Sequence, residues 1–334
     1  MAQIVLGMAT SHGPLLSTPP EEWNQRAEAD RRNPHLYFRG RPYRFEELLE
    51  VRAAEHFERE ITLEKRAARH AACQRAIAAL GDTLARVAPD VVVIIGDDQE
   101  EVFLDDNMPA LAIYWGEKVI NAPVPAHFSR PPGLAIAEWG HAPPEPTTVP
   151  CAPDLALHLI RSLIQDGFDV AQSRQLPAGR YGTHSIPHAF GFIYRRIMRD
   201  QFIPNVPVFI NTFYPPNQPS VRRCYEFGQA LGRAIAAWDS DKTVAVIASG
   251  GLSHFVIEED LDQQVLAALR SRDPAAIVSL PVDLMESGTS EIRNWIAVAG
   301  ALADTPLEMQ LIDYVPCYRS AAGTGNAMGF AQWL

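Results

Sequence analysis

Short apolar runs alternate with longer amphipathic stretches along this chain. The clearest runs are rich in β-branched residues and end in glycine, proline or polar residues, which is typical of strands buried on both faces. They lie at 4–9, 91–96, 110–116, 206–216 and 243–254, and a further strand is predicted at 168–176. Apolar residues at helical spacing predict helices over 63–90, 152–167 and 220–241, and Ser220 is a candidate N-cap for the last. Strands joined by helical crossovers predict a mostly parallel sheet.

Two regions do not show this alternation of predicted strands and helices. Residues 19–62 are polar, rich in Arg and Glu and dotted with aromatic residues, so we interpret them as an insertion that ends in helix. Residues 258–334 are interpreted as mostly helical with a glycine-rich tail. The predicted fold class is α/β: a single domain over 1–334, with a mostly parallel central sheet flanked by helices and a polar helical insertion at 19–62.

Composition and charge narrow the class of protein. The 334 residues are 47% hydrophobic and 21% charged, as in soluble globular enzymes. The formal net charge of −11 repels phosphate backbones and anionic membrane surfaces, so neither nucleic acid nor a membrane is an expected partner. Four widely spaced cysteines and an amino terminus without a basic leader predict reduced thiols and a cytoplasmic location.

Polar residues follow three of the predicted strands at their carboxyl ends. His12 follows the first strand, Asp97, Asp98 and Gln99 follow the second, and His254 follows the last. In a parallel sheet these ends share one edge, where ligands bind. A His or Asp at a strand end is often only a cap for the following helix. Three strand ends with such residues are harder to explain in that way, and the spacing by itself indicates a metal or hydrolytic site without specifying the reaction.

Five segments, in order, carry a family resemblance: SHGPLL, PDVVVIIGDDQ, NTFYPPNQPSVRRCYEFGQALGRAI, IASGGLSH and SGTSEIRNWIAVAGAL. The sequence resembles the class III extradiol ring-cleavage dioxygenases, of the type of the protocatechuate 4,5-dioxygenase catalytic subunit and its gallate and 3-O-methylgallate relatives. The resemblance implies a non-haem Fe(II) centre held by two histidines and one carboxylate, with open positions for substrate and O₂.

Carried over by position, the resemblance makes His12 the first histidine ligand and Glu291 the carboxylate ligand. The second histidine is replaced by Gln99, whose carbonyl oxygen is a weaker donor than imidazole. Three accounts stay open: Gln99 ligates directly, the metal site is degraded, or the position is filled by another residue such as Asp97, Asp98, His184 or His35.

The resemblance also implies a catalytic base and a second acid. A histidine between the central strands accepts a substrate proton; the sequence offers His188, with His184 as the alternative. His254 matches a histidine that contacts substrate or oxygen intermediates. Three further residues are expected at the substrate: Tyr214, Asp98 and Gly251, the last because glycine lets the backbone approach closely.

The function that follows is cleavage of a catechol-type aromatic acid by O₂, with 3-O-methylgallate, gallate or protocatechuate as candidate substrates, as in the degradation of lignin-derived aromatics. Two alternatives remain, a zinc hydrolase and a relative that has lost its iron. We also expect a homodimer, with the 19–62 insertion as a lid over the pocket or a dimer contact.

Overall fold

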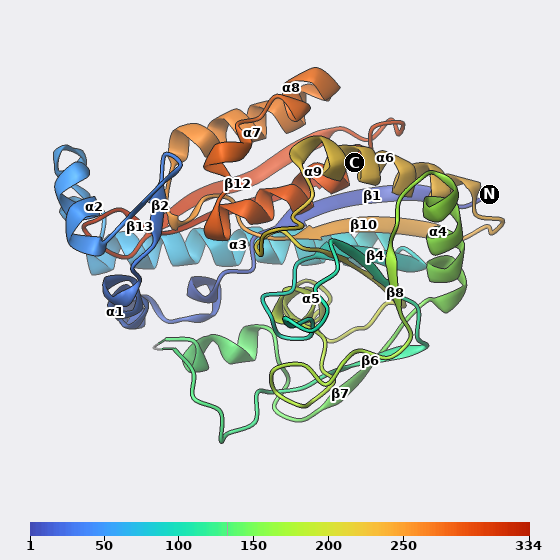
Figure 1. The fold of residues 1–334 in the computed structure, drawn as a ribbon, viewed down its shortest axis with the longest axis horizontal. Helices are drawn as coiled ribbons and strands as arrows, with labels where there is room; N and C mark the ends of the chain where they lie inside the picture. Colours follow the sequence, from blue (N-terminus) through green and yellow to red (C-terminus); the bar gives the residue numbers. More distant parts are fainter. Residues whose placement is uncertain (132) are drawn as a thin grey trace.

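The computed structural model describes residues 1–131 and 133–334 and contains one central sheet with helices packed against it (Figure 1). Within those residues the sheet has nine strands, in the order β11-β13-β1-β10-β4-β9-β5-β8, with β12 also paired to β13. Its centre is four parallel strands: β1 (Gln3–Thr10), β10 (Thr243–Ser249), β4 (Val91–Gly96) and β9 (Asn205–Ile210).

Antiparallel pairing extends this parallel centre on both sides. On one side β13 pairs with β1, β11 and β12; on the other, β5 runs antiparallel to β9 and parallel to β8. Their bounds are β5 (Leu111–Tyr114), β8 (Ala171–Ser173), β11 (His254–Val256), β12 (Met309–Tyr318) and β13 (Thr324–Trp333). The sheet is therefore mixed, with its parallel strands in the middle.

The alternation of side chains along β4 explains why the central strands are apolar throughout. Val91, Val93 and Ile95 belong to one hydrophobic cluster, whereas Val92 and Ile94 belong to another. Successive strand residues point to opposite faces, so a strand covered on both faces needs apolar residues at every position.

Helices cover both faces. One cluster includes α4 (Pro153–Gln165), α6 (Val221–Ala237), α7 (Glu259–Ser271), α8 (Pro274–Val278) and α9 (Ile292–Ala301); the other includes α3 (Leu63–Val87) and α5 (His188–Phe192). The short helical turns are η1 (Pro14–Ser17), η2 (Pro20–Glu22), η3 (Ala53–Glu55), η4 (Phe57–Arg59), η5 (Ala135–Gly140), η6 (Ile193–Ile197), η7 (Val282–Leu284) and η8 (Ser287–Glu291). None of the described helices combines the length and apolarity that a membrane crossing requires.

Most predicted elements are confirmed. The α/β class, the strands that begin near residues 4, 91, 110, 206 and 243, and the three long helices are present, and the Ser220 hydroxyl accepts a hydrogen bond from the Arg223 backbone N–H as an N-cap. The strand predicted over 168–176 is only three residues long, as β8. Two short strands that the sequence analysis did not predict, β6 (Lys118–Asn121) and β7 (Thr147–Pro150), pair with each other.

The helical interpretation of residues 258–334 is wrong for its last part. Helices α7, α8 and α9 are present, but β12 and β13, each ten residues long, then pair antiparallel as part of the sheet. The sequence TGNAMGFAQW lacks the β-branched run of the other strands. Small residues are needed because a Cβ on Gly325 would lie 2.3 Å from the Cys317 carbonyl oxygen, and one on Gly329 2.8 Å from Leu252 Cδ1.

The insertion forms α1 (Asn24–Arg32), the hairpin of β2 (Leu36–Phe38) and β3 (Arg41–Tyr43), and α2 (Phe45–Val51), all at one end of the sheet (Figure 1). It is held to the β12–β13 turn by a buried bidentate ion pair, in which Arg319 donates to both oxygens of Asp30 at 2.6 and 2.7 Å. Thr324 donates to the same carboxylate at 2.6 Å, and Arg52 donates to the carbonyl oxygens of Ile257 and Gly323.

Asp30→Ala leaves the Arg319 guanidinium buried without its counter-charge, so we expect the free energy of unfolding to fall by about 3–5 kcal/mol. Urea denaturation measures this change. Asp82→Ala is the control, because it removes the exposed partner of Arg199 and should cost at most about 1 kcal/mol. Equal losses in the two variants would contradict the anchoring role of Asp30.

Candidate metal and substrate site

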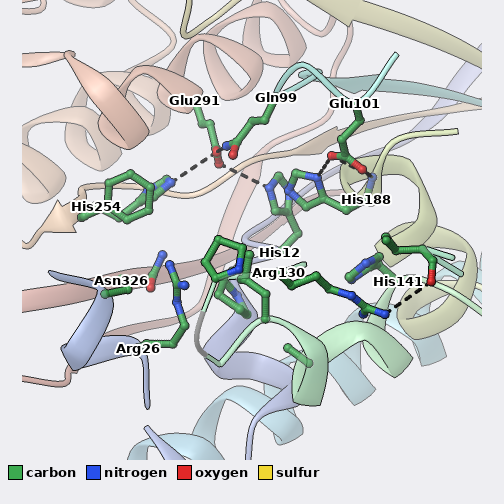
Figure 2. A pocket seen from close by; sticks show the side chains of 18 of the residues that line it. His12, Arg26, Gln99, Glu101, Arg130, His141, His188, His254, Glu291 and Asn326 are labelled. Atoms are coloured by element: carbon green, nitrogen blue, oxygen red, sulfur yellow. Dashed lines mark hydrogen bonds and ion pairs between the residues drawn. The ribbon is translucent and has the colours of Figure 1, made fainter. Parts of the chain in front are cut away.

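The parallel strands bring their carboxyl ends to one edge of the sheet, where the polar residues of the sequence gather. His12 lies just beyond β1, Asp97 and Gln99 just beyond β4, and Gly251 just beyond β10. Glu291 reaches the same edge from η8, which leads into α9. Segments far apart in the sequence thus supply one compact group, of which Figure 2 shows His12, Gln99 and Glu291.

Glu291 is the centre of this group. One oxygen, Oε2, accepts the Gly251 backbone N–H at 2.7 Å and lies 3.5 Å from His12 Nε2. The other, Oε1, accepts the Gln99 amide N–H at 2.8 Å. Figure 2 shows Gln99 and Glu291 side by side, with His254 on one side and His12 on the other.

His12 is oriented by a serine. The Ser249 hydroxyl donates to the Ala189 carbonyl oxygen at 2.6 Å, so its one hydrogen is used. It therefore accepts from His12 Nδ1, 3.0 Å away, which fixes the proton of the ring on Nδ1. Burial lowers the pKa of His12 to about 3, so the ring is neutral and Nε2 has a free lone pair beside Glu291. This is the arrangement that metal-binding histidines require.

His254 contacts the other oxygen of the carboxylate. Its Nδ1 lies 2.7 Å from the Leu252 carbonyl oxygen and its Nε2 3.3 Å from Glu291 Oε1. Burial alone would lower the pKa of His254, but the Glu291 charge raises it above its usual value. Burial would likewise raise the pKa of Glu291, yet His254 and His12 hold it well below its usual range.

Asp97 has a buried oxygen without a partner. Its Oδ1 accepts the Asn294 amide at 3.0 Å, but its Oδ2 has no hydrogen-bond partner among the described residues, and the side chain is 1% exposed. Burial, and then the charge of Glu291, raise the pKa of Asp97 well above its usual value. Ligand atoms of His12, Asp97 and Glu291 all lie within 4.8 Å of one another. A buried oxygen left unsatisfied beside an imidazole and a second carboxylate fits a divalent cation.

A cavity of 390 Å³ opens beside this group. Its size is that of a pocket for a small organic ligand. Part of its wall comes from the insertion, through Arg26, Ala29, Asp30 and Asn33 of α1 and the residue after it. Arg130 and Arg180 add positive charge, paired with Glu138 and Glu100 respectively.

His188 lines the cavity next to His12, with the two rings edge to face at a centroid distance of 4.7 Å. Glu101 bonds it twice, through Nδ1 and through its backbone N–H, the latter at 3.2 Å. Burial alone would lower the pKa of His188, but Glu101 raises it to about 9. The Nδ1 contact leaves Nε2 as the ring nitrogen available to a ligand.

Two residues of this wall, Glu101 and His141, were missed in the sequence. Glu101 lies two positions past Gln99 in an acidic run, and its contact with His188 spans 87 positions. His141 packs against the His188 ring at 5.9 Å from within the proline-rich segment, and burial lowers its pKa to about 4. The only local signal for His141 was the presence of a histidine in a segment whose composition is otherwise typical of a loop.

The remaining sequence candidates divide into two groups. Tyr214 lines the cavity, as expected. Asp98 is not among the cavity-lining residues; its carboxylate accepts the backbone N–H groups of Glu101, Val102 and Phe103. Gly251 contacts Glu291 and His254 and not the expected substrate. Its backbone N–H donates to Glu291, and a Cβ at this position would lie 2.6 Å from His254 Cε1.

The alternative histidines lie away from the cavity. His184 is exposed, with Nδ1 2.9 Å from the Leu176 carbonyl oxygen, and His35 is exposed in the insertion. Neither is among the residues that line the pocket. His188 and His254 do line it, as do His12, Gln99 and Glu291.

Comparison with known proteins agrees with this geometry. Residues 62–323 match the family described as the catalytic LigB subunit of aromatic ring-opening dioxygenase, and the chain belongs to that family. The match includes Gln99, His188, His254 and Glu291, and it begins after His12 and most of the insertion.

The individual relatives match a smaller part of the chain than the family does. The chain is 29% identical over 166 residues to a 2,3-dihydroxyphenylpropionate/2,3-dihydroxicinnamic acid 1,2-dioxygenase of Azotobacter vinelandii, covering 50% of this chain and 44% of the relative. It is 31% identical over 165 residues to a gallate dioxygenase of Pseudomonas putida, covering 45% of each. The chain thus spans about half the length of the curated relatives it matches.

Proposed function

We propose that this protein is an Fe(II)-dependent extradiol dioxygenase that opens the ring of a catechol-type aromatic acid with O₂. The observation that carries the proposal is the pairing of His12 Nε2, its lone pair free, with the Glu291 carboxylate at the edge of a 390 Å³ cavity. Membership of the ring-opening dioxygenase family supports the reaction class. No comparable family match supports a zinc hydrolase.

A carboxylate-bearing ring suits the wall of the cavity. Arg26, Arg130 and Arg180 place guanidinium groups there, and Arg130 and Arg180, which pair with Glu138 and Glu100, would have to share their N–H donors with the substrate. Guanidinium groups bind carboxylates through directed, charge-assisted hydrogen bonds. Gallate, 3-O-methylgallate and protocatechuate, and the dihydroxyphenyl acids of the relatives' names, share this chemistry.

A ferrous ion held by His12 and Glu291 would supply the electrons that activate O₂ toward an electron-rich ring. The chain's own residues manage the protons. His188 presents Nε2 to a substrate hydroxyl, but its raised pKa keeps the ring protonated near neutral pH. The charges of Asp97 and Glu291 contribute to that raised pKa, so a cation that neutralised them would lower it and let the ring accept the hydroxyl proton, with Glu101 stabilising the imidazolium. His254 lies on the other side of Glu291 and lines the cavity, with Nε2 facing Glu291 Oε1; if Glu291 binds a metal, that N–H would be available to an oxygen of the substrate.

Oxygen consumption tests the proposal. With Fe(II) restored under anaerobic conditions, adding gallate, 3-O-methylgallate, protocatechuate or 2,3-dihydroxyphenylpropionate should start O₂ uptake and yield a ring-opened product, measured with an oxygen electrode and by mass spectrometry. Monohydroxylated analogues of the same acids are the control. No uptake with any catechol, in protein that contains iron, would overturn the dioxygenase.

His12→Ala and Glu291→Ala each remove a metal ligand, so both should abolish iron retention, measured as metal per chain after anaerobic desalting. His141→Ala is the matched control, because His141 contacts His188 and should leave the iron content unchanged. Full iron content in either ligand variant would show that the assignment of that residue is wrong.

His188→Phe should keep iron and lower kcat by about 10²-fold or more, the usual worth of a general base. The comparison variant is His184→Phe, which alters an exposed histidine outside the cavity and should leave kcat unchanged. The opposite order of effects would make His184 the base.

Oligomeric state and location remain predictions from the sequence. The homodimer is tested by light scattering on purified protein. A cytoplasmic location is tested by cell fractionation.

A further inference from the structure

We infer that Asp97, and not Gln99, completes the metal site, giving a ligand set of one imidazole and two carboxylates. The inference rests on the proposed function only in assuming that the protein uses a divalent metal. It departs from the two-histidine, one-carboxylate set that the sequence resemblance implies.

The first argument is the state of the Asp97 side chain. Its carboxylate is 1% exposed, and Oδ2 has no hydrogen-bond partner among the described residues, whereas Oδ1 is held by Asn294. A buried carboxylate oxygen without a partner costs the fold free energy. One oxygen held and one left bare is the arrangement of an oriented ligand.

The second argument is position. Ligand atoms of Asp97, His12 and Glu291 lie within 4.8 Å of one another, close enough for one cation to contact all three. Within residues 1–131 and 133–334, no other group of His, Cys, Asp or Glu side chains meets this condition. His254 contacts Glu291 but does not join the group.

The third argument is what Gln99 already does. Its amide N–H donates to Glu291 Oε1 at 2.8 Å, which orients the carboxylate from the cavity side. Gly251 orients the other oxygen through its backbone N–H. Gln99 is therefore a positioning residue for Glu291.

The fourth argument is charge. Asp97 and Glu291 are two buried carboxyl groups whose ligand atoms lie within 4.8 Å of each other and of a His12 ring nitrogen. A divalent cation neutralises both carboxylates at once. Such an oxygen-rich site favours hard cations, so Mn²⁺, which does not require oxygen-free handling, is a suitable probe.

The experiment titrates Mn²⁺ into chelator-treated protein by isothermal calorimetry and records the melting temperature with and without the metal. Asp97→Asn should weaken Mn²⁺ binding by more than about 100-fold, beyond the range usual for residues outside the ligand set. The metal-free variant should melt at or above the wild-type temperature, because the Asn side chain keeps an oxygen for the Asn294 hydrogen bond and replaces only the oxygen that has no partner among the described residues.

Gln99→Ala should still bind Mn²⁺, with an affinity lowered by about 10–100-fold at most. Asp98→Asn is the matched control. Asp98 directly follows Asp97 in the sequence and is also buried, but its carboxylate accepts hydrogen bonds from backbone N–H groups. That variant should melt at a lower temperature and keep its Mn²⁺ affinity.

Three results would overturn the inference: unchanged Mn²⁺ affinity in Asp97→Asn, an equal loss in Gln99→Ala, or a metal-free Asp97→Asn protein that melts below wild type. None of these measurements uses turnover. A protein that binds metal as described but consumes no O₂ with any catechol refutes the dioxygenase and leaves the ligand set standing.

Discussion

The buried carboxylate of Glu291 must be satisfied from several directions at once, and this constraint organises the edge of the sheet. Gly251 and Gln99 donate hydrogen bonds to it, and His254 and His12 place ring nitrogens within 3.5 Å of it. These groups follow different strands, so they meet only because β1, β10 and β4 are adjacent and parallel. The sheet order is therefore a condition for the chemistry.

Hydrogen bonds from neighbouring residues orient those groups relative to the cavity. Ser249 bonds to the Ala189 carbonyl oxygen and so sets the tautomer of His12, while Glu101 takes Nδ1 of His188 and directs its Nε2 toward the ligand space. Asn294, on α9, holds one oxygen of Asp97. Each partner is buried or part-buried, where a polar group without a partner is costly, so these orientations are stable ones.

The insertion at residues 19–62 forms part of the pocket wall. Helix α1 supplies cavity-lining residues, and the Asp30–Arg319 pair holds it against the turn of the β12–β13 hairpin. The hairpin in turn places Asn326 in the cavity wall and bonds it to Arg319. The insertion thus contributes to the cavity wall, whereas its roles as a lid and as a dimer contact stay predictions.

The sequence by itself determined the α/β layout, because apolar periodicity and caps such as Ser220 are local signals. Motif order also identified His12, Glu291, His188 and His254 as pocket residues. Only the tertiary structure decided that the Gly/Ala-rich tail is a buried strand, and that Asp97 carries an unsatisfied oxygen while the oxygens of Asp98 are taken. Adjacent carboxylates are equivalent in sequence. They differ only in which distant groups pack against them, and that depends on how the whole chain closes.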